Sequence, residues 1–241
     1  MLVISPHLDD AVLSLRGVIG AHPGSTVATV CAQPPADRTL LMPSWDNDGR
    51  FASSFECVMA RQAEDAVALE HLGAHQLLLD FVDRQYGSNS QASVTKALVR
   101  VISDHPDRDL YGPLGVGHAD HELVAASFLL AALQSGRRTV WIYEDVPYRL
   151  ERPDLFSAKL GSLRRQGWHL RQEHPHLAPP EVREAALQSY AIELPKLGDR
   201  PIRAPETVWR ASLVKRRSER GALLPFGRRA RRAAVEEPAG D

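Results

Sequence analysis

Two short clusters of histidine and carboxylate side chains are the chemically informative part of this sequence. The first is Ser5-Pro6-His7-Leu8-Asp9-Asp10, close to the start of the chain, and the second is Gly117-His118-Ala119-Asp120-His121. Imidazole and carboxylate groups bind borderline divalent metal ions and transfer protons near neutral pH. The two clusters therefore predict a metal site or an acid–base site.

The spacing of these residues suggests a division of roles. A ligand set of nitrogen and oxygen without cysteine suits Zn²⁺, and a catalytic zinc site uses three protein ligands plus a water. His7, Asp10 and His121 supply such a set. Asp9 points away from its neighbour Asp10 at a turn, so it is better placed as the general base for a water molecule.

The remaining polar residues of the second cluster fit supporting roles. His118 lies three residues before His121, roughly one helical turn. As an imidazolium it would stabilise a tetrahedral oxyanion or protonate a leaving amine. Asp120 would orient one of the histidines, as the ligands of metal sites usually require.

Each cluster taken alone also has a simpler explanation. Adjacent aspartates such as Asp9 and Asp10 most often cap a helix and charge its first turn. The segment from His118 to His121 is by itself typical of a polar loop. Because both clusters follow predicted strands in one chain, two coincidences would be needed, and the metal site is favoured.

Other strand ends also carry carboxylates. Asp80 and Asp83 follow the apolar run 75–79, and Glu144 and Asp145 follow the run 139–143. We expect Asp80, Glu144 and Asp145 to contact the substrate. For Glu144 and Asp145, a capping turn before the next proline is an equally good explanation.

The elements that position these residues alternate along the chain. Apolar runs predict strands at 2–5, 25–32, 75–79, 109–112 and 139–143, and helical periodicity predicts helices at 10–19, 54–72, 93–103 and 122–134. This pattern indicates an α/β fold with an open, mostly parallel sheet covered by helices on both faces. The ligand site of such a sheet lies beyond the carboxyl ends of its strands, which is where both clusters fall.

The pattern weakens after residue 147, where prolines become frequent. Helices are expected at about 154–166 and 180–192, within a less regular C-terminal cap. We expect one domain over 1–214 and a flexible tail over 215–241, whose arginine pairs indicate a solvated end. Residues 33–47, which contain three prolines, are expected to form a long loop.

Composition excludes several classes of protein. The 241 residues suit one large domain, and a formal net charge of -1 argues against a nucleic-acid partner selected by overall charge. Cys31 and Cys57 form no CxxC pair, so neither a disulfide framework nor a thiolate zinc site is predicted. No apolar run is long enough for a membrane span, and a cytoplasmic location is expected. Composition does not predict the oligomeric state.

Both clusters resemble motifs of the PIG-L/LmbE-like N-acetylglucosaminyl deacetylases. Residues 5–10 resemble the PHxDD/HPDD motif of this family, and residues 117–121 resemble its GHxDH motif. Between them, residues 61–64 look like the R-x-x-E helix that ends in LG, here at 72–73. Residues 183–190 resemble the later K-x-x-A-x-x-x-Y helix, so the resemblance covers roughly residues 2–195.

The resemblance implies a Rossmann-like zinc hydrolase that removes an acyl group, usually acetyl, from the nitrogen of an amino sugar. It implies the same roles for both clusters: His7, Asp10 and His121 as metal ligands, Asp9 as general base and His118 as acid or electrostatic group. It also makes Arg61 a sugar or acyl contact. An ion pair of Arg61 with Glu64 or Asp65 on the same helix is the alternative.

Two departures from the family pattern concern the substrate. Some members place an oxyanion-binding tyrosine at the position of Val116, and the later helix often reads Y-x-S-Q where this chain has Tyr190-Ala191-Ile192-Glu193.

An inactive sugar-binding or regulatory protein on the same scaffold is the alternative function, although the ligand set and Asp9 are all present. Aromatic residues that could stack on a sugar, or simply border the core, are Trp45, Tyr86, Tyr148 and Trp168.

Overall fold

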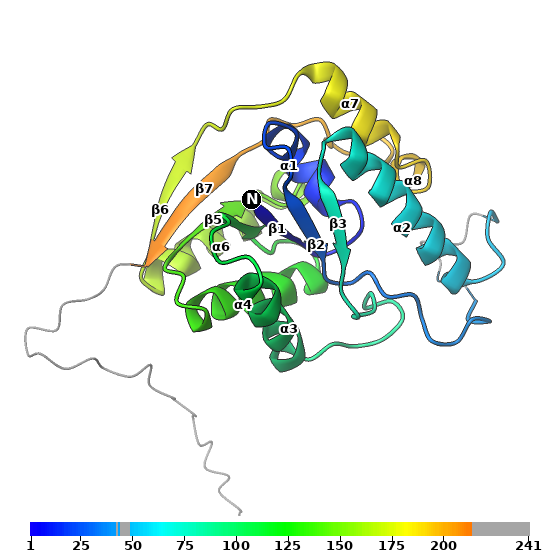
Figure 1. Cartoon of the computed structure of the whole chain (residues 1–241), viewed down its shortest axis with the longest axis horizontal. Helices are drawn as coiled ribbons and strands as arrows, with labels where there is room; N and C mark the ends of the chain where they lie inside the picture. The colour runs from blue at the N-terminus through cyan, green and yellow to red at the C-terminus, as the bar shows by residue number, and fades with distance from the viewer. Residues whose placement is uncertain (42, 44–48, 214–241) are drawn as a thin grey trace, which may run out of the picture.

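Seven strands form one sheet in the order β3-β2-β1-β4-β5-β7-β6 (Figure 1). The structure is a computed structural model that describes residues 1–41, 43 and 49–213. The strands are β1 (Leu2–Ser5), β2 (Thr26–Thr29), β3 (His75–Leu78), β4 (Leu110–Pro113), β5 (Thr139–Tyr143), β6 (Trp168–Glu173) and β7 (Val208–Leu213). The five strands from β3 to β5 are parallel, and β7 and β6 continue the sheet in antiparallel pairing.

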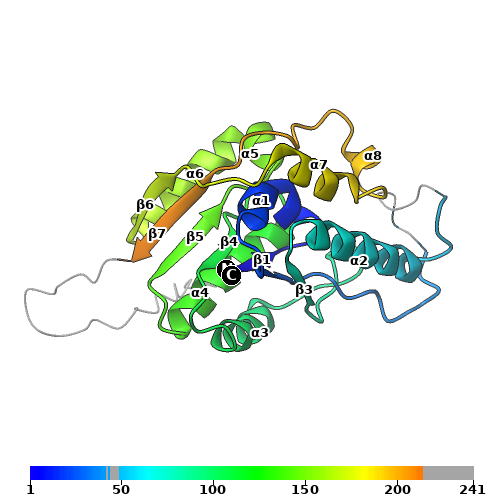
Figure 2. The same cartoon turned by 45° about the horizontal axis from the view of Figure 1, so that its top comes forward.

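Helices cover both faces of this sheet (Figures 1 and 2). They are α1 (Asp10–Gly20), α2 (Ser54–His71), α3 (Gln91–Ser103), α4 (Ala119–Gln134), α5 (Tyr148–Glu151), α6 (Pro153–Arg165), α7 (Pro180–Gln188) and α8 (Leu194–Leu197). Successive residues of β1 serve opposite faces: Leu2 and Ile4 pack with α3, α4 and α6, whereas Val3 packs with α1, α2 and α7. Burial on both faces explains why β1 is apolar throughout its core residues instead of alternating with polar ones.

Local sequence signals explain the helix ends. The Ser53 side chain accepts a hydrogen bond from the backbone of Glu56 at the start of α2, and Glu56 in turn accepts one from the backbone of Ala52. This reciprocal arrangement satisfies one free donor of the first helical turn and one donor just before the helix. After α2, Gly73 adopts a φ of +63°, a conformation that favours glycine and ends the helix.

The predicted α/β class is confirmed, and the C-terminal part differs from the prediction in its detail. The region expected to be a less regular cap contributes β6 and β7, an antiparallel pair of strands that extends the sheet beyond β5 and is separated in sequence by α7 and α8. One residue of the edge strand β6 and two of β7 are buried, so the apolar runs that identify the parallel strands are missing there. The predicted tail 215–241, Trp45 and part of the predicted loop 33–47 lie outside the described residues.

The order of the strands places the two clusters side by side. β1 and β4 are hydrogen-bonded neighbours, and the chain leaves them toward opposite faces, into α1 and α4. Such a reversal in strand order opens a crevice at the carboxyl ends of the two strands. His7 and His121, which are 114 positions apart in the sequence, therefore meet at one point.

Candidate active site

A tight turn between β1 and α1 holds the first cluster in place. Ser5 Oγ donates a hydrogen bond to the carbonyl of His7 and accepts one from the backbone of Ala11. The backbone N–H of His7 donates to Asp10 Oδ2 over 2.9 Å. These bonds close the turn, and the side chains of His7, Asp9 and Asp10 line the same pocket.

The second cluster begins with a histidine that caps a helix. His118 is the residue before α4, and its Nδ1 accepts a hydrogen bond from the backbone N–H of Asp120 over 3.2 Å. This cap starts α4 at Ala119, three residues earlier than the sequence predicted. Because Nδ1 is an acceptor, Nε2 carries the N–H when the ring is neutral.

Three candidate metal ligands meet at the crevice. Asp10 Oδ2 lies 3.1 Å from His7 Nδ1 and 3.1 Å from His121 Nε2. Ligand atoms about 2.0–2.1 Å from a tetrahedral zinc ion are about 3.3 Å apart, so these separations suit the ion. His121 Nε2 is buried and makes no hydrogen bond of suitable geometry, so a metal ion placed between it and Asp10 would satisfy this polar atom. The three residues expected to bind zinc therefore fit it.

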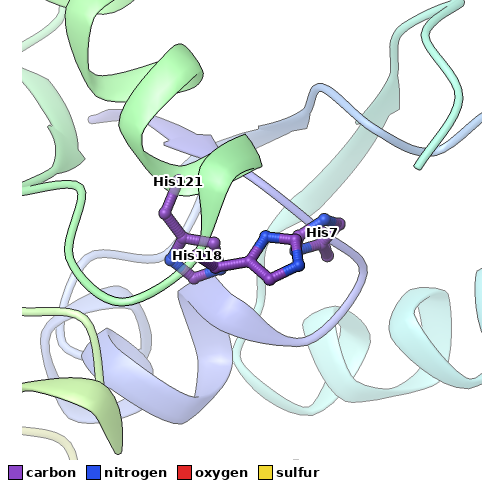
Figure 3. Close-up of side chains that lie close together, drawn as sticks. All are labelled: His7, His118 and His121. Carbon is purple, nitrogen blue, oxygen red and sulfur yellow. The ribbon is translucent and has the colours of Figure 1, made fainter. Parts of the chain in front are cut away.

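The histidines form the centre of this arrangement (Figure 3). His7, His118 and His121 each offer a nitrogen, and these atoms lie within 4.8 Å of one another. His118 meets the other two rings nearly edge to face, with centroid distances of 5.1 Å to His7 and 5.5 Å to His121. His118 is thus next to the ligand set, where it was expected to act on the substrate.

Two further carboxylates fix the orientation of His7 and His121, the two candidate ligand histidines. Asp120 Oδ2 lies 3.2 Å from Nε2 of His7, and Asp145 Oδ1 lies 2.7 Å from Nδ1 of His121. A carboxylate on the far nitrogen of a metal-binding histidine sets its tautomer and raises its basicity. Asp120 therefore lies where an orienting residue was expected, and its partner is His7.

Charge interactions in the site affect the histidines differently. Burial opposes protonation of His121, but the charges of Asp10 and Asp145 outweigh it and raise its pKa to about 9. Burial lowers the pKa of His118, and the nearby positive charges of His7 and His121 lower it further. His118 is consequently neutral near pH 7, and its Nε2–H is available as a hydrogen-bond donor.

Asp9 lines the cavity and does not cap the helix that it precedes. It lies at the N-cap position of α1, yet its side chain makes no capping hydrogen bond, so the capping explanation does not apply to it. Burial, followed by the charges of Asp10 and Glu193, raises its pKa to about 7. A carboxylate with a pKa close to the working pH is suited to accept and return a proton.

A cavity of about 530 Å³ opens beside these residues. Residues of both clusters line it. The other lining residues include Arg61, Asp83, Tyr148, Glu193 and Arg200. Arg61 forms an ion pair with Glu193 over 3.0 Å. Arg61 lines the cavity, where it was expected to contact a substrate, and its charge also acts on Asp65 of the same helix, one of the two partners in the alternative explanation.

Three residues expected to contact substrate lie elsewhere. Asp80 is exposed and bridges to Cys31 through its backbone. The Glu144 carboxylate accepts hydrogen bonds from Arg149 and from the indole of Trp209. Asp145 is buried against His121, so its position supports an orienting role in place of a substrate contact.

The cavity contains one of the aromatic candidates and an arginine that the sequence did not reveal. Of the four aromatic candidates, Tyr148 lines it, whereas Trp168 is part of the core and Tyr86 packs against a small apolar cluster. The Tyr148 ring contacts that of His121 with a centroid distance of 5.1 Å. Arg200, which stacks over Tyr148, had no sequence signal, because it follows α8 in an irregular segment.

No helix among the described residues has the length and apolar character that a membrane crossing requires.

Comparison with solved structures shows where this fold occurs. A mutant of the teicoplanin-pathway deacetylase Orf2 aligns with a TM-score of 0.68 and 22% identity, over 89% of this chain and 98% of its own. The A40926 pseudoaglycone deacetylase Dbv21 aligns with a TM-score of 0.66 and 23% identity, over 88% and 96%. At these identities the likeness establishes the fold.

Sequence comparison identifies the family. A search of curated protein sequences finds no match. The family model of PIG-L, described as GlcNAc-PI de-N-acetylase, matches residues 2–133, which is more than half of the chain and includes both clusters. The chain belongs to the PIG-L family of de-N-acetylases, a family of amide hydrolases.

Proposed function

We propose that this protein is a zinc-dependent hydrolase that removes an N-acyl group, most simply acetyl, from an amino sugar or a small molecule containing one. The observation that supports this most directly is the meeting of His7, Asp10 and His121 at the ends of β1 and β4. Asp9, which has no capping bond, lines the same cavity as these ligands.

His7, Asp10 and His121 would hold the zinc ion, which when bound supplies the positive charge that acidifies a water molecule and polarises an amide carbonyl. Asp9 is the base that receives the proton of the attacking water. Its raised pKa, about 7, allows the carboxyl to return that proton to the departing amine nitrogen. One residue then serves both proton transfers.

His118 acts on the oxygen of the amide. Its Nδ1 is occupied by the backbone N–H of Asp120, so the neutral ring directs a donor, Nε2–H, to its other side. A donor aimed at an oxygen that gains negative charge stabilises the tetrahedral state more than the starting amide. We expected an imidazolium here, but the lowered pKa of His118 favours this neutral donor.

The cavity suits a polar substrate with one apolar side. Arg61 and Glu193 provide paired donors and acceptors of the kind that bind sugar hydroxyls, while Leu13, Leu197 and Tyr148 provide apolar contact. A volume of about 530 Å³ is within the range of small-molecule sites. The substrate is therefore a small amino-sugar compound.

Release of free amine from N-acetylated amino sugars tests this function. Chelation should abolish amine release, and about one equivalent of Zn²⁺ should restore it. The variant Asp9→Asn should retain the metal but lose at least about 100-fold in kcat, the lower end of what a general base contributes. Asp80→Asn, which changes an exposed carboxylate outside the cavity, is the matched control.

Two results would contradict the proposal. Near-normal turnover of Asp9→Asn would show that another group is the base. A purified protein that binds zinc and N-acetylated amino sugars but releases no amine would support the alternative of a sugar-binding protein that has lost turnover.

A further inference from the structure

A second group of potential ligands lies at the other edge of the His7 ring. His7, Cys31 and Asp120 each offer a ligand atom, and these atoms lie within 4.8 Å of one another. Asp120 Oδ2 is 3.2 Å from His7 Nε2, and Asp83 Oδ2 is 3.7 Å from the same nitrogen. His7 Nδ1, by contrast, faces Asp10 and the proposed zinc site. The single imidazole thus lies between two groups of ligands.

We propose that Cys31, Asp120 and the Nε2 edge of His7 form a second site for a thiophilic divalent cation, and that its occupation inhibits the reaction. The inhibition rests on the proposed function, whereas cation binding at the second site does not. Thiolate, imidazole and carboxylate together suit borderline ions such as Zn²⁺, Co²⁺ and Cd²⁺.

The backbone holds these donors in place from three separate parts of the fold. Cys31 follows β2, and its N–H donates to the carbonyl of Pro6 over 2.9 Å. Asp120 lies in the first turn of α4, and its Oδ2 accepts a hydrogen bond from the backbone of Arg84. His7, Cys31 and Asp120 are at most 9% exposed, so a cation would bind among groups that are already ordered.

The distribution of charge favours a cation at this edge. Three carboxylates contact the His7 ring: Asp10 on one side, and Asp83 and Asp120 on the other. An ion in the first site would be paired with Asp10, which leaves Asp83 and Asp120 with the imidazole and a backbone N–H. His7 and Asp83 also line the main cavity, which gives an ion a route inward.

Occupation of the second site would weaken the first because they share His7. A cation there replaces the hydrogen on Nε2 and takes Asp120 from its orienting role, and the thiol hydrogen of Cys31 is also replaced. Both protons pass to solvent, as is usual when a metal binds to protonated ligands. Each ion then lowers the affinity of the site for the other, and the coupling is reciprocal.

Cobalt titration of the full chain tests the second site directly. Coordination by a thiolate gives cobalt a near-ultraviolet charge-transfer band, and the chain has only two cysteines, so the source of the band can be assigned. The first equivalent should bind without this band, and the second should produce it. The band should persist in the control Cys57→Ser and be absent in Cys31→Ser and Cys31→Ala.

Metal content and inhibition provide independent readouts. Wild type should bind two equivalents, whereas each Cys31 variant should bind one, which also shows that the variant is folded. Amine release should fall as Zn²⁺ exceeds one equivalent, and the inhibitory concentration should rise at least about ten-fold in the Cys31 variants.

The proposal is overturned if wild type shows no thiolate band at any cobalt concentration, or if the band is lost in Cys57→Ser and kept in Cys31→Ser. A band that appears with the first equivalent would also overturn it, since the two sites would then not be distinct. Absence of amine release at one equivalent of zinc would contradict the proposed function and leave the cobalt result valid.

Discussion

Asp145 Oδ1 lies 2.7 Å from His121 Nδ1, and both side chains are almost completely buried. The other oxygen of Asp145 accepts a hydrogen bond from the backbone of Gly115 over 2.8 Å. This carboxylate therefore joins the end of β5 to the turn after β4 and holds the His121 ring with Nε2 toward Asp10. The end of β5, the turn after β4 and the start of α4 together set the direction of the His121 ring, a candidate metal ligand.

Replacement of Asp145 should therefore weaken metal binding although Asp145 is not itself a ligand. In Asp145→Ala the ring of His121 loses the acceptor that fixes its tautomer, and we expect zinc affinity to fall about 10–100-fold. Competition with a chromophoric chelator measures this change.

The adjacent residue provides the control. Glu144 is also a buried carboxylate at the end of β5, but it bonds to Arg149 and Trp209. Glu144→Gln should leave zinc affinity unchanged. Equal losses in both variants would show that general disturbance of the strand end, and not the bond to His121, is responsible.

At position 117, next to His118, two separate constraints favour glycine over any larger residue. Its φ is +80°, and a Cβ atom added there would lie 2.6 Å from Cδ1 of Tyr148. Gly117→Ala should cost about 1–2 kcal/mol for the backbone conformation, with a further cost for the overlap. Turnover should fall as well, because both His118 and Tyr148 line the cavity.

Gly136→Ala separates the two contributions. Gly136 has a φ of +75°, and an added Cβ there would meet nothing within 4 Å. This variant should show the conformational cost alone in urea unfolding, with normal turnover. If Gly117→Ala is no less stable than Gly136→Ala, the contact with Tyr148 is not a constraint.

The central site was largely predictable because its residues follow strands directly. Asp9, Asp10 and His7 are adjacent to an apolar run, and the convergence of parallel strand ends brings them to the second cluster. The sequence could not distinguish Asp145 as an orienting residue from a substrate contact. That distinction depends on the contact of Asp145 with His121, which is 24 positions away in the sequence and leaves no local sequence pattern.

The C-terminal half was predicted less well for a related reason. Strands β6 and β7 are mostly not buried and lack a continuous apolar run, and the short helix α8 lies among prolines. Glu193, which pairs with Arg61 in the cavity, was visible only as a departure from a family motif. Its position in the cavity became apparent when α7 and the following segment were placed against α1 and α2.

Glu206 joins the C-terminal segment to α1 through buried donors. Its carboxylate accepts hydrogen bonds from the backbone N–H groups of Gly17 and Val18, with distances of 2.8–3.1 Å. Glu206→Ala would remove this buried acceptor from both N–H groups, which costs about 1–3 kcal/mol each where no other acceptor replaces it. We expect the free energy of unfolding to fall by about 2–6 kcal/mol in urea titration.

Two variants define the source of that effect. Glu206→Gln keeps one oxygen as an acceptor and should lose less stability than Glu206→Ala. Glu181→Ala removes an exposed carboxylate at the start of α7 and should change stability by no more than about 0.5 kcal/mol. A loss below about 1 kcal/mol for Glu206→Ala would mean that water or another group replaces the carboxylate.

Asp65 should make the stability of the protein depend on pH. Burial raises its pKa to about 6, although Gln76 and Tyr190 donate hydrogen bonds to the carboxylate. The folded state then holds this proton more tightly than the unfolded state, whose aspartate has a pKa near 3.9. The free energy of unfolding should fall as the pH rises from about 4 to about 6, by about 3 kcal/mol for this residue.

The variant Asp65→Asn cannot ionise, so it should be free of this loss. Its stability relative to wild type should improve by about 2–3 kcal/mol between pH 4 and pH 7, whatever fixed cost the altered hydrogen bonds impose. Urea unfolding at both pH values measures the difference, with Asp104→Asn as the exposed control that should show no such change. A difference that is constant with pH, or that shifts in favour of wild type, would show that Asp65 ionises at its ordinary pH because the bonds from Gln76 and Tyr190 compensate its burial.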